Sequence, residues 1–221
     1  MRWLVVVGLL TFAADQVTKY LAVAKLTTAL DGHAGSARIE AFLSAKNLDN
    51  DPIVPGQPYK LHKPVHVIDQ FWHHRYVENP GAAWGMFGGL PEPIRRPFFH
   101  VVSLTAIGFI LYMFRKLPKE AAMVRLALSL VLGGALGNFF DRLVRGYVID
   151  FIDWHWRNQP GLRWPTFNVA DAAICVGVAL LLLDSMKKKP APLPVAADSS
   201  PADVQGASPV ESAGKLGPTS L

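Results

Sequence analysis

The chain contains a single cysteine, Cys175, among its 221 residues. One cysteine excludes an intrachain disulfide and any metal site built from several thiolates, so cysteine gives no information about the redox compartment. Charged residues are also scarce: they make up 18% of the chain, whereas 51% of its residues are hydrophobic and the mean hydropathy is +0.23. This balance is unusual for a soluble enzyme and indicates a membrane protein.

Four apolar segments are long enough, or nearly so, to cross a bilayer as helices, which takes about 20 residues. They comprise residues 3–26, 98–114, 121–140 and 167–183. None of them alternates apolar and polar residues as a barrel strand does, so we predict an all-α membrane protein with four transmembrane helices. We interpret the first segment as a retained helix and not a cleaved signal peptide, because its apolar character resumes after Lys19.

Basic residues are concentrated at the ends of the apolar segments, although the net charge of the chain is only +5. This distribution is typical of topology signals and does not indicate nucleic-acid binding. With four spans, eight basic residues fall on one side: Arg2, Arg115, Lys116, Lys119, Arg125, Lys187, Lys188 and Lys189. We therefore predict that both termini are cytoplasmic and that both large loops lie outside.

Three segments outside the apolar runs differ in character. Residues 31–64 are polar, contain Gly and Pro, and predict an irregular insertion in the outer loop. Residues 65–78 alternate apolar and polar side chains, which predicts a small β-like cradle on the outer membrane face. Residues 190–221 are rich in Pro, Ala, Ser and Gly and predict a disordered cytoplasmic tail, which leaves residues 1–189 as the membrane domain.

Asp15 and Lys19 lie inside the first apolar segment. A charged side chain in a membrane helix costs about 2.5 to 3.5 kcal/mol on insertion scales, so its presence is a functional hypothesis by default. The two residues are four positions apart and share a helix face. They are equally compatible with a structural ion pair and with a role in holding a substrate or orienting a site.

The third apolar segment ends in GGALGNFFDR at residues 133–142. Its glycines permit another backbone or a ligand to approach closely. Asn138, Asp141 and Arg142 fall on one face of the helix end, at positions i, i+3 and i+4. Taken alone, this cluster is compatible with an ordinary polar helix terminus.

Two further carboxylates flank the loop that joins the third and fourth segments. Asp150 lies in GYVIDF at residues 146–151, and Asp171 follows Asn168 in FNVAD at residues 167–171. We expect both acids at the adjoining outer ends of these helices. Two carboxylates in a low-dielectric site have pKa values that separate, so one holds a proton while the other acts as a base. Aspartic proteases use this division, although a loop cap and a helix-terminal hydrogen bond would also explain the two residues.

Five motifs together resemble those of lipoprotein signal peptidase, also called signal peptidase II, in order and approximate spacing. They are DQVTK at residues 15–19, NPGAAWG at 79–85, GALGNFFDR at 134–142, GYVIDF at 146–151 and FNVAD at 167–171. The resemblance implies that Asp150 and Asp171 form the catalytic pair. It also implies that eight further residues bind substrate or support the site: Asp15, Lys19, Asn79, Gly81, Asn138, Asp141, Arg142 and Asn168.

The resemblance implies an aspartic endopeptidase of the bacterial inner membrane, with its active site near the outer face. Its substrates would be diacylglyceryl-modified prolipoproteins, cleaved just before the lipidated cysteine, and it would act as a monomer surrounded by membrane lipid, without nucleic acid. The resemblance also implies that no metal and no other cofactor is needed, and the sequence offers no cluster of His, Cys and carboxylate residues at metal-ligand spacing that contradicts this. His73 and His74 are interpreted as surface or interfacial residues.

Other functions remain open from the residues themselves. A Gly-x-Gly-Asp protease is disfavoured because Asp150 follows Tyr147, Val148 and Ile149. A proton-coupled transporter subunit would use Asp15, Lys19, Asp150 and Asp171 as relay groups, but would place its acids near the bilayer midplane. A non-catalytic protein that binds lipid or peptide is the third alternative.

Overall fold

The computed structural model describes residues 2–46, 48, 64–82, 85–118, 120–157 and 159–186. The helices are α1 (Arg2–Leu26), α2 (Gly35–Ser44), α3 (Glu92–Lys116), α4 (Ala122–Val144) and α5 (Val169–Ser185); the strands are β1 (Val65–Ile68), β2 (Trp72–Asn79) and β3 (Val148–Trp154), and Pro160–Leu162 forms a 3₁₀ turn. The predicted tail and part of the predicted insertion lie outside the described residues.

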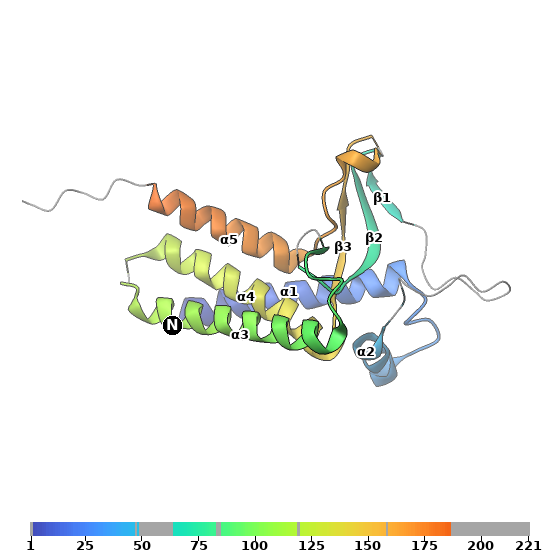
Figure 1. Cartoon of the computed structure of the whole chain (residues 1–221), viewed down its shortest axis with the longest axis horizontal. Helices are drawn as coiled ribbons and strands as arrows, with labels where there is room; N and C mark the ends of the chain where they lie inside the picture. The colour runs from blue at the N-terminus through green and yellow to red at the C-terminus, as the bar shows by residue number, and fades with distance from the viewer. Residues whose placement is uncertain are drawn as a thin grey trace, which may run out of the picture. The chain divides into compact units, whose positions relative to one another are not determined.

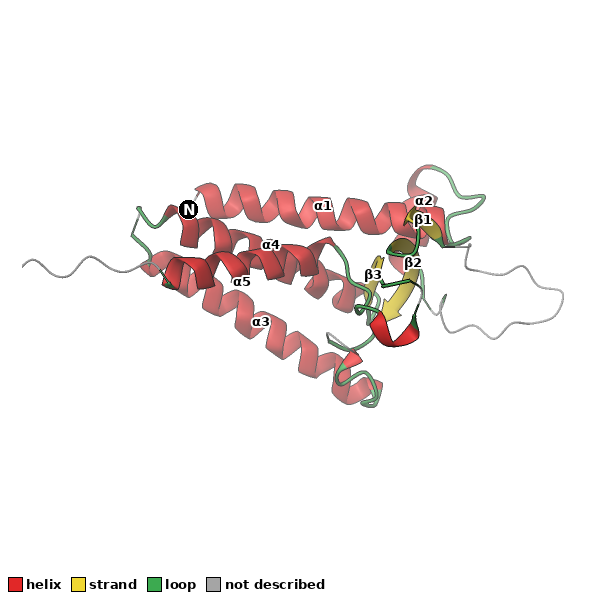
Figure 2. Ribbon diagram, turned by 90° about the horizontal axis from the view of Figure 1, so that it is seen from above, coloured by secondary structure: helices red, strands yellow, loops and turns green. Residues whose placement is uncertain are grey.

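The four long helices run side by side as a bundle, with the sheet at one end (Figures 1 and 2). Helix α4 packs against α1, α3 and α5. Each of the four predicted apolar segments is largely helical. Among the residues that the structure describes, three helices are long and apolar enough to cross a membrane: Val5–Leu26, Glu92–Lys116 and Ala122–Val144. Helix α5 has 17 residues, so it is shorter than the other three.

Glycines on α4 explain how closely its neighbours approach. A Cβ atom on Gly134 would collide with the carbonyl oxygen of Ala170 on α5. A Cβ atom on Gly137 would collide with the carboxylate of Asp15 on α1. The predicted close backbone approach at this motif is therefore present, and it brings both α1 and α5 against one turn of α4.

The three strands form one antiparallel sheet in the order β1-β2-β3. Val65 pairs with His74 across β1 and β2, and Val77 pairs with Asp150 across β2 and β3. The predicted small β structure at residues 65–78 is thus confirmed. A buried apolar cluster joins the sheet to the end of α1 and to α2: Ala22, Val23, Leu26, Leu30, Phe42, Ala45, Leu48, Tyr76, Tyr147, Ile149 and Phe151.

Two expectations about local structure are wrong. Asp150 lies in the middle of β3 and not at a helix end, because residues 148–154 pair with β2 over most of their length. The insertion predicted as irregular contains α2, where the side chain of Phe42 is buried. The guanidinium of Arg145 lies 4.2 Å from the centre of the Phe42 ring, and its Nη2 donates to the Phe42 carbonyl at 3.0 Å. A short, weakly apolar segment does not by itself indicate such a contact with a distant residue, so the helix was not predicted.

Candidate active site

Asp150 and Asp171 meet through Asn168, which immediately precedes α5. The Asn168 side-chain Nδ2 donates to Asp150 Oδ1 at 2.7 Å, and the Asn168 backbone N–H donates to Asp171 Oδ2 at 3.2 Å. Asn168 therefore holds the carboxylate of Asp150, on the sheet, next to the carboxylate of Asp171, on the helix bundle. The two acids that the sequence predicts as a pair are brought together by this bridge.

The local sequence explains the orientation of Asp171. Asn168 is the N-cap of α5, and its Oδ1 accepts a hydrogen bond from the Asp171 backbone N–H at 2.9 Å. The Asp171 carboxylate in turn accepts the Asn168 backbone N–H, so the two residues form a capping box. A carboxylate in the first turn of a helix is also favoured by the helix dipole. The FNVAD motif thus fixes the Asp171 side chain through the hydrogen bonds that cap the N-terminus of α5.

Two further asparagines donate hydrogen bonds to the carboxylate oxygens that Asn168 does not contact. Asn79, at the end of β2, donates from Nδ2 to Asp150 Oδ2 at 2.9 Å. Asn138 of α4 donates from Nδ2 to Asp171 Oδ1 at 2.7 Å. Each acid therefore receives one bond from its own asparagine and one from the Asn168 bridge. Both oxygens of both carboxylates have fixed partners.

A buried ion cluster lies behind the two acids. The Nζ of Lys19 lies 2.8 Å from Oδ2 of Asp15 and 2.8 Å from Oδ2 of Asp141. Nη1 of Arg145 lies 2.9 Å from Oδ1 of Asp141, and all four side chains are fully buried. Two acids and two bases balance in charge, as burial of ionised groups requires. Lys19 also donates to Oδ1 of Asn138 at 3.2 Å, which joins the cluster to the site.

The same carboxylates bind the backbone next to the site. Asp141 Oδ2 accepts from the Ile149 N–H at 3.2 Å, and Asp15 Oδ1 accepts from the Ala170 N–H at 2.9 Å. Ile149 and Ala170 each directly precede one of the two candidate catalytic acids. The ion cluster therefore positions the backbone of both acids, and the Asp15–Lys19 pair is more than a means of tolerating charge in α1.

Arg142 and Gly81 form a further part of the site, next to Asn79. Nη2 of Arg142 donates to the Gly81 carbonyl at 2.8 Å, and the guanidinium lies 4.6 Å from the centre of the Phe99 ring on α3. The Gly81 N–H donates to Oδ1 of Asn79 at 3.0 Å, which orients the Asn79 amide toward Asp150. All the residues that the sequence assigned to the site thus lie in one connected network.

A cavity of about 490 Å³ opens at this network. Asp171, Asn79, Asn138 and Arg142 provide its polar wall, while its apolar wall was not assigned from the sequence and consists largely of Trp154, Trp164, Phe167, Ile174 and Val176. The concentration of tryptophans in the outer loop was the available signal for this wall. The cavity joins acids to an apolar surface, as a site for a partly apolar substrate requires.

The two acids differ in environment. Asp150 is 1% exposed, whereas Asp171 is partly buried and lines the cavity. Burial, followed by the nearby charge of Asp171, raises the pKa of Asp150 to about 8, although the amides of Asn79 and Asn168 act in the opposite direction. Asp150 therefore retains a proton near neutral pH.

The comparisons with known proteins agree with this arrangement. The family described as Signal peptidase (SPase) II matches residues 7–187, which is most of the chain. The chain belongs to the signal peptidase II family. It is therefore a peptidase of a membrane-enzyme family, and its several apolar helices make it a multi-pass membrane protein. The family that the five motifs resemble is confirmed.

Individual relatives support the same assignment. The lipoprotein signal peptidase of Anaeromyxobacter sp. (strain Fw109-5) is 48% identical over 197 residues, which covers 88% of this chain and 86% of the relative. That of Syntrophotalea carbinolica is 44% identical over 124 residues, or 56% of this chain and 74% of the relative. A solved bacterial membrane enzyme superposes with a TM-score of 0.58 at 27% identity, covering 86% of this chain and 93% of that one. A second has a TM-score of 0.57 at 26% identity.

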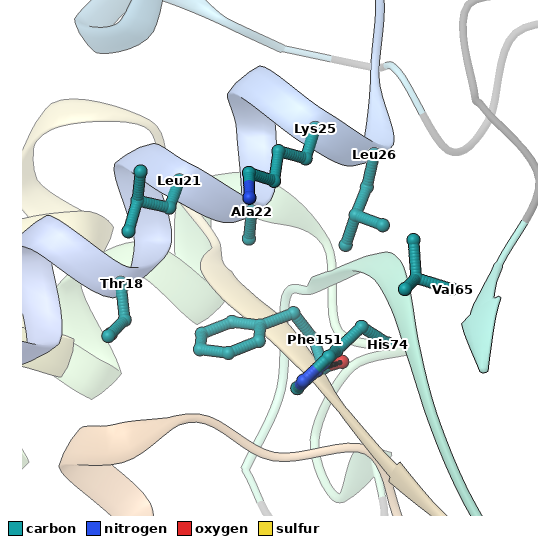
Figure 3. A pocket seen from close by; sticks show the side chains of 8 residues that line it. All are labelled: Thr18, Leu21, Ala22, Lys25, Leu26, Val65, His74 and Phe151. Atoms are coloured by element: carbon teal, nitrogen blue, oxygen red, sulfur yellow. Dashed lines mark hydrogen bonds between the residues drawn. The ribbon is translucent and has the colours of Figure 1, made fainter. Parts of the chain in front are cut away.

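A second cavity, of about 280 Å³, lies between α1 and the sheet of this family member (Figure 3). Its lining comes from α1 and from all three strands: Thr18, Leu21, Ala22, Lys25, Leu26, Val65, His74 and Phe151. In Figure 3 the His74 and Phe151 side chains lie next to each other on the side opposite α1. None of the lining residues named here is a carboxylate, so the cavity with Asp171 remains the candidate active site.

The expectations about histidines need correction. His73 is 6% exposed and is not a surface residue, because the sheet places it between neighbours on both sides. The expectation that histidines and carboxylates do not cluster is also wrong. Candidate ligand atoms of His66, Asp69 and His73 all lie within 4.8 Å of one another. The turn between β1 and β2 creates this cluster.

Proposed function

We propose that this peptidase is an aspartic endopeptidase that removes signal peptides from diacylglyceryl-modified prolipoproteins, with Asp150 and Asp171 as its catalytic pair. The observation that carries the proposal is the Asn168 bridge, whose two hydrogen bonds, of 2.7 and 3.2 Å, hold one acid on β3 and the other on α5. Two carboxylates held at one point, one of them lining a largely apolar cavity, are the arrangement that aspartic proteolysis needs.

The protonation of the two acids assigns their roles. Asp171 faces the cavity and acts as the base that takes a proton from the attacking water. Asp150 is protonated near neutral pH because its pKa is raised to about 8, and it donates its proton to the oxygen of the scissile carbonyl as the water adds. Collapse of the tetrahedral intermediate breaks the C–N bond, and the leaving amine takes up the proton that Asp171 accepted. A hydroxyl of the intermediate returns its proton to Asp150 as the carbonyl re-forms, so both acids regain their starting states.

The asparagines and the ion cluster keep the acids in place during this exchange. Asn79 and Asn138 bind the carboxylate oxygens that Asn168 leaves available. The ion cluster fixes the backbone before each acid through Ile149 and Ala170. Preorganised carboxylates need no rearrangement when charge moves between them, which is the main electrostatic contribution to such a reaction.

The substrate proposal rests on the cavity and on the relatives. The curated relatives named above are lipoprotein signal peptidases. A signal helix and two acyl chains are apolar and remain in the bilayer, so only the scissile bond has to reach water. The apolar wall formed by residues such as Phe167, Ile174 and Val176 would contact these apolar parts while the polar wall receives the peptide. The cleavage position just before the lipidated cysteine is the one that the family resemblance implies, and it is part of this proposal.

The membrane arrangement belongs to the same proposal. Helix α5 supplies a fourth span, which places the sheet and both acids near the outer face of the bacterial inner membrane and both termini in the cytoplasm. The distribution of Lys and Arg supports this orientation. The monomer with its cytoplasmic tail, surrounded by lipid and without a metal or other cofactor for catalysis, would be the active form.

A gel-shift assay tests the proposal. The purified full chain in detergent is given a diacylglyceryl-modified prolipoprotein, with the unlipidated precursor alongside. We expect cleavage of the lipidated form only, and loss of cleavage in both Asp150→Asn and Asp171→Asn. Asp31→Asn removes an exposed acid outside the site and serves as the matched control with wild-type cleavage. Turnover retained by either site variant would overturn the catalytic pair. No cleavage by folded wild type would favour lipid binding or proton-coupled transport.

A further inference from the structure

A histidine cluster lies on the sheet, apart from the catalytic network. His66 on β1 pairs directly with His73 on β2, and His73 pairs directly with Asp153 on β3. Residues directly opposite each other on antiparallel strands place their side chains on the same face. The His66 and His73 rings are 3.9 Å apart, and His155 lies on the other side, with its ring 4.2 Å from that of His73. Three imidazoles therefore lie side by side, with interplanar angles of 57° and 61° between neighbouring rings.

Asp69 completes the cluster from the turn between β1 and β2. Its Oδ1 lies 3.9 Å from Nδ1 of His66, and the candidate ligand atoms of His66, Asp69 and His73 lie within 4.8 Å of one another. Ligands around tetrahedral zinc lie about 3.4 Å apart, since each bond is about 2.0–2.1 Å long. The side chains of His66 and Asp69 are 58% and 81% exposed, so both can rotate to close this gap.

The buried histidines leave ring nitrogens without partners. Within the described part of the chain, neither Nε2 of His73 nor Nδ1 and Nε2 of His155 makes a hydrogen bond. Burial of a polar nitrogen without a partner is unfavourable. A buried imidazole nitrogen with no hydrogen-bond partner is available to bind a metal ion.

The charges around the cluster are compatible with the binding of a small cation. Asp153 is 1% exposed on its side chain and forms ion pairs with Arg75 at 2.9 Å and with Arg163 at 3.4 Å. Its Oδ1 lies 3.8 Å from Nδ1 of His155. Asp153 is thus placed to neutralise the two guanidinium groups and to orient His155, while Asp69 remains as the anionic ligand. Carboxylates beside ligating histidines commonly serve this orienting role.

We propose that His66, Asp69 and His73 form a binding site for a divalent transition-metal ion, zinc in particular, with His155 as a nearby fourth ligand. Two or three imidazoles and one carboxylate are the donor set that such ions prefer. The site is structural. It fastens the β1–β2 turn to the sheet that also carries Asn79 and Asp150, and it takes no part in the proteolytic step. The proposal is therefore independent of the proposed substrate.

Metal titration of the full chain tests this site. The protein is purified in detergent with an affinity tag that contains no histidine, treated with chelator, and titrated with Co²⁺ as a spectroscopic probe and with Zn²⁺ in competition. We expect saturable binding of one ion per chain, displacement of Co²⁺ by Zn²⁺, and a higher melting temperature with Zn²⁺ than with chelator. A ligand-to-Ala change should weaken binding by about tenfold or more.

The variants separate this site from adventitious binding. His66→Ala and Asp69→Asn change exposed side chains and should leave the protein folded, whereas His33→Ala removes an exposed histidine outside the cluster and should leave the affinity unchanged. His73→Asn tests the buried ligand wherever it folds. Binding that is absent from wild type, exceeds one site without saturation, or persists unchanged in the His66→Ala, Asp69→Asn double variant would overturn the proposal.

Discussion

Lys19 of α1 and Asp141 of α4 form a fully buried ion pair, with 2.8 Å between Nζ and Oδ2. The same carboxylate oxygen accepts the backbone N–H of Ile149, the residue before Asp150. An ionic contact between two helices thereby fixes the strand that carries one of the two proposed catalytic acids. This relationship gives Lys19 a positioning role that depends on charge as well as on packing.

Lys19→Met should strongly destabilise the protein. It removes the cation between Asp15 and Asp141 and leaves buried carboxylate charge that only Arg145 still balances. Breaking a buried ion pair by removing one partner costs about 3–5 kcal/mol. Thermal unfolding in detergent measures the loss, with Lys46→Met as the exposed-lysine control. Combining Lys19→Met with Asp15→Asn removes one buried charge of each sign, leaves the Asp141–Arg145 pair intact, and should restore part of the stability. An unchanged melting temperature in the single variant would contradict the role of the ion pair.

Gly137→Ala should disturb both stability and cleavage. The added methyl group would meet the Asp15 carboxylate, which must move away from the Ala170 N–H that it accepts. Overpacking of this kind costs about 1–3 kcal/mol. Gly108→Ala on α3 is the matched control, because no atom lies within 4 Å of a Cβ built there. The melting temperature should fall for Gly137→Ala and be retained for Gly108→Ala; equal values for the two would show that the close approach is unimportant.

Asn168→Ser should separate helix capping from the positioning of the acids. Serine is a good N-cap, so α5 should keep its start and the melting temperature should change little. The serine side chain is too short to replace the 2.7 Å bond from Nδ2 to Asp150, so kcat should fall by at least about tenfold, since a misplaced catalytic group reduces the rate steeply. Asn168→Ala, which loses both functions, should also unfold at a lower temperature. Wild-type kcat in Asn168→Ser would exclude a positioning role.

The pH dependence of cleavage should follow the proton on Asp150. Its pKa is raised to about 8, and the proposed mechanism needs this acid protonated. The rate should therefore be maintained near neutral pH and fall about tenfold per pH unit well above pH 8. Single-turnover cleavage in detergent, with substrate binding followed separately, provides the measurement. A rate that stays constant to about pH 10 would contradict the assignment of the proton to Asp150.

Stability should respond to pH in the same direction. The folded-state pKa of Asp150 lies above its ordinary value of 3.8, so the native state holds this proton more tightly than the unfolded state does. Its contribution to stability is complete below about pH 4 and is lost as the pH rises through about 8. Asp150→Asn has no proton to lose. The melting temperature of Asp150→Asn relative to wild type should therefore rise between about pH 5 and pH 9.

The sequence predicted the helices, and it named as site residues a set that the structure brings together in one network. The four apolar segments correspond to α1, α3, α4 and α5, because bilayer-length apolar runs leave the backbone few alternatives to a helix. The spacing of Asp15 and Lys19 predicted their contact for a similarly local reason, since residues four apart meet on one helix face. The asparagines were found through motif resemblance and not through any property visible in their spacing.

Long-range contacts account for what the sequence could not predict. The strand that carries Asp150 exists because residues 148–154 pair with β2, and no local pattern distinguishes this short apolar stretch from the end of a helix. Helix α2 depends in the same way on the contact between Phe42 and Arg145, which lie 103 positions apart. The histidine cluster was missed because His66 and His73 meet only when β1 folds back on β2.

The sequence by itself thus determined the membrane helices and the family, and it singled out the two acids as candidates, because apolar length and motif chemistry are carried by neighbouring residues. Only the tertiary structure decided that Asn168 bridges the two acids, that the ion cluster supports the backbone next to both of them, and that burial raises the pKa of Asp150. Hydrogen bonds and desolvation depend on distances between residues far apart in the chain, and folding alone sets those distances.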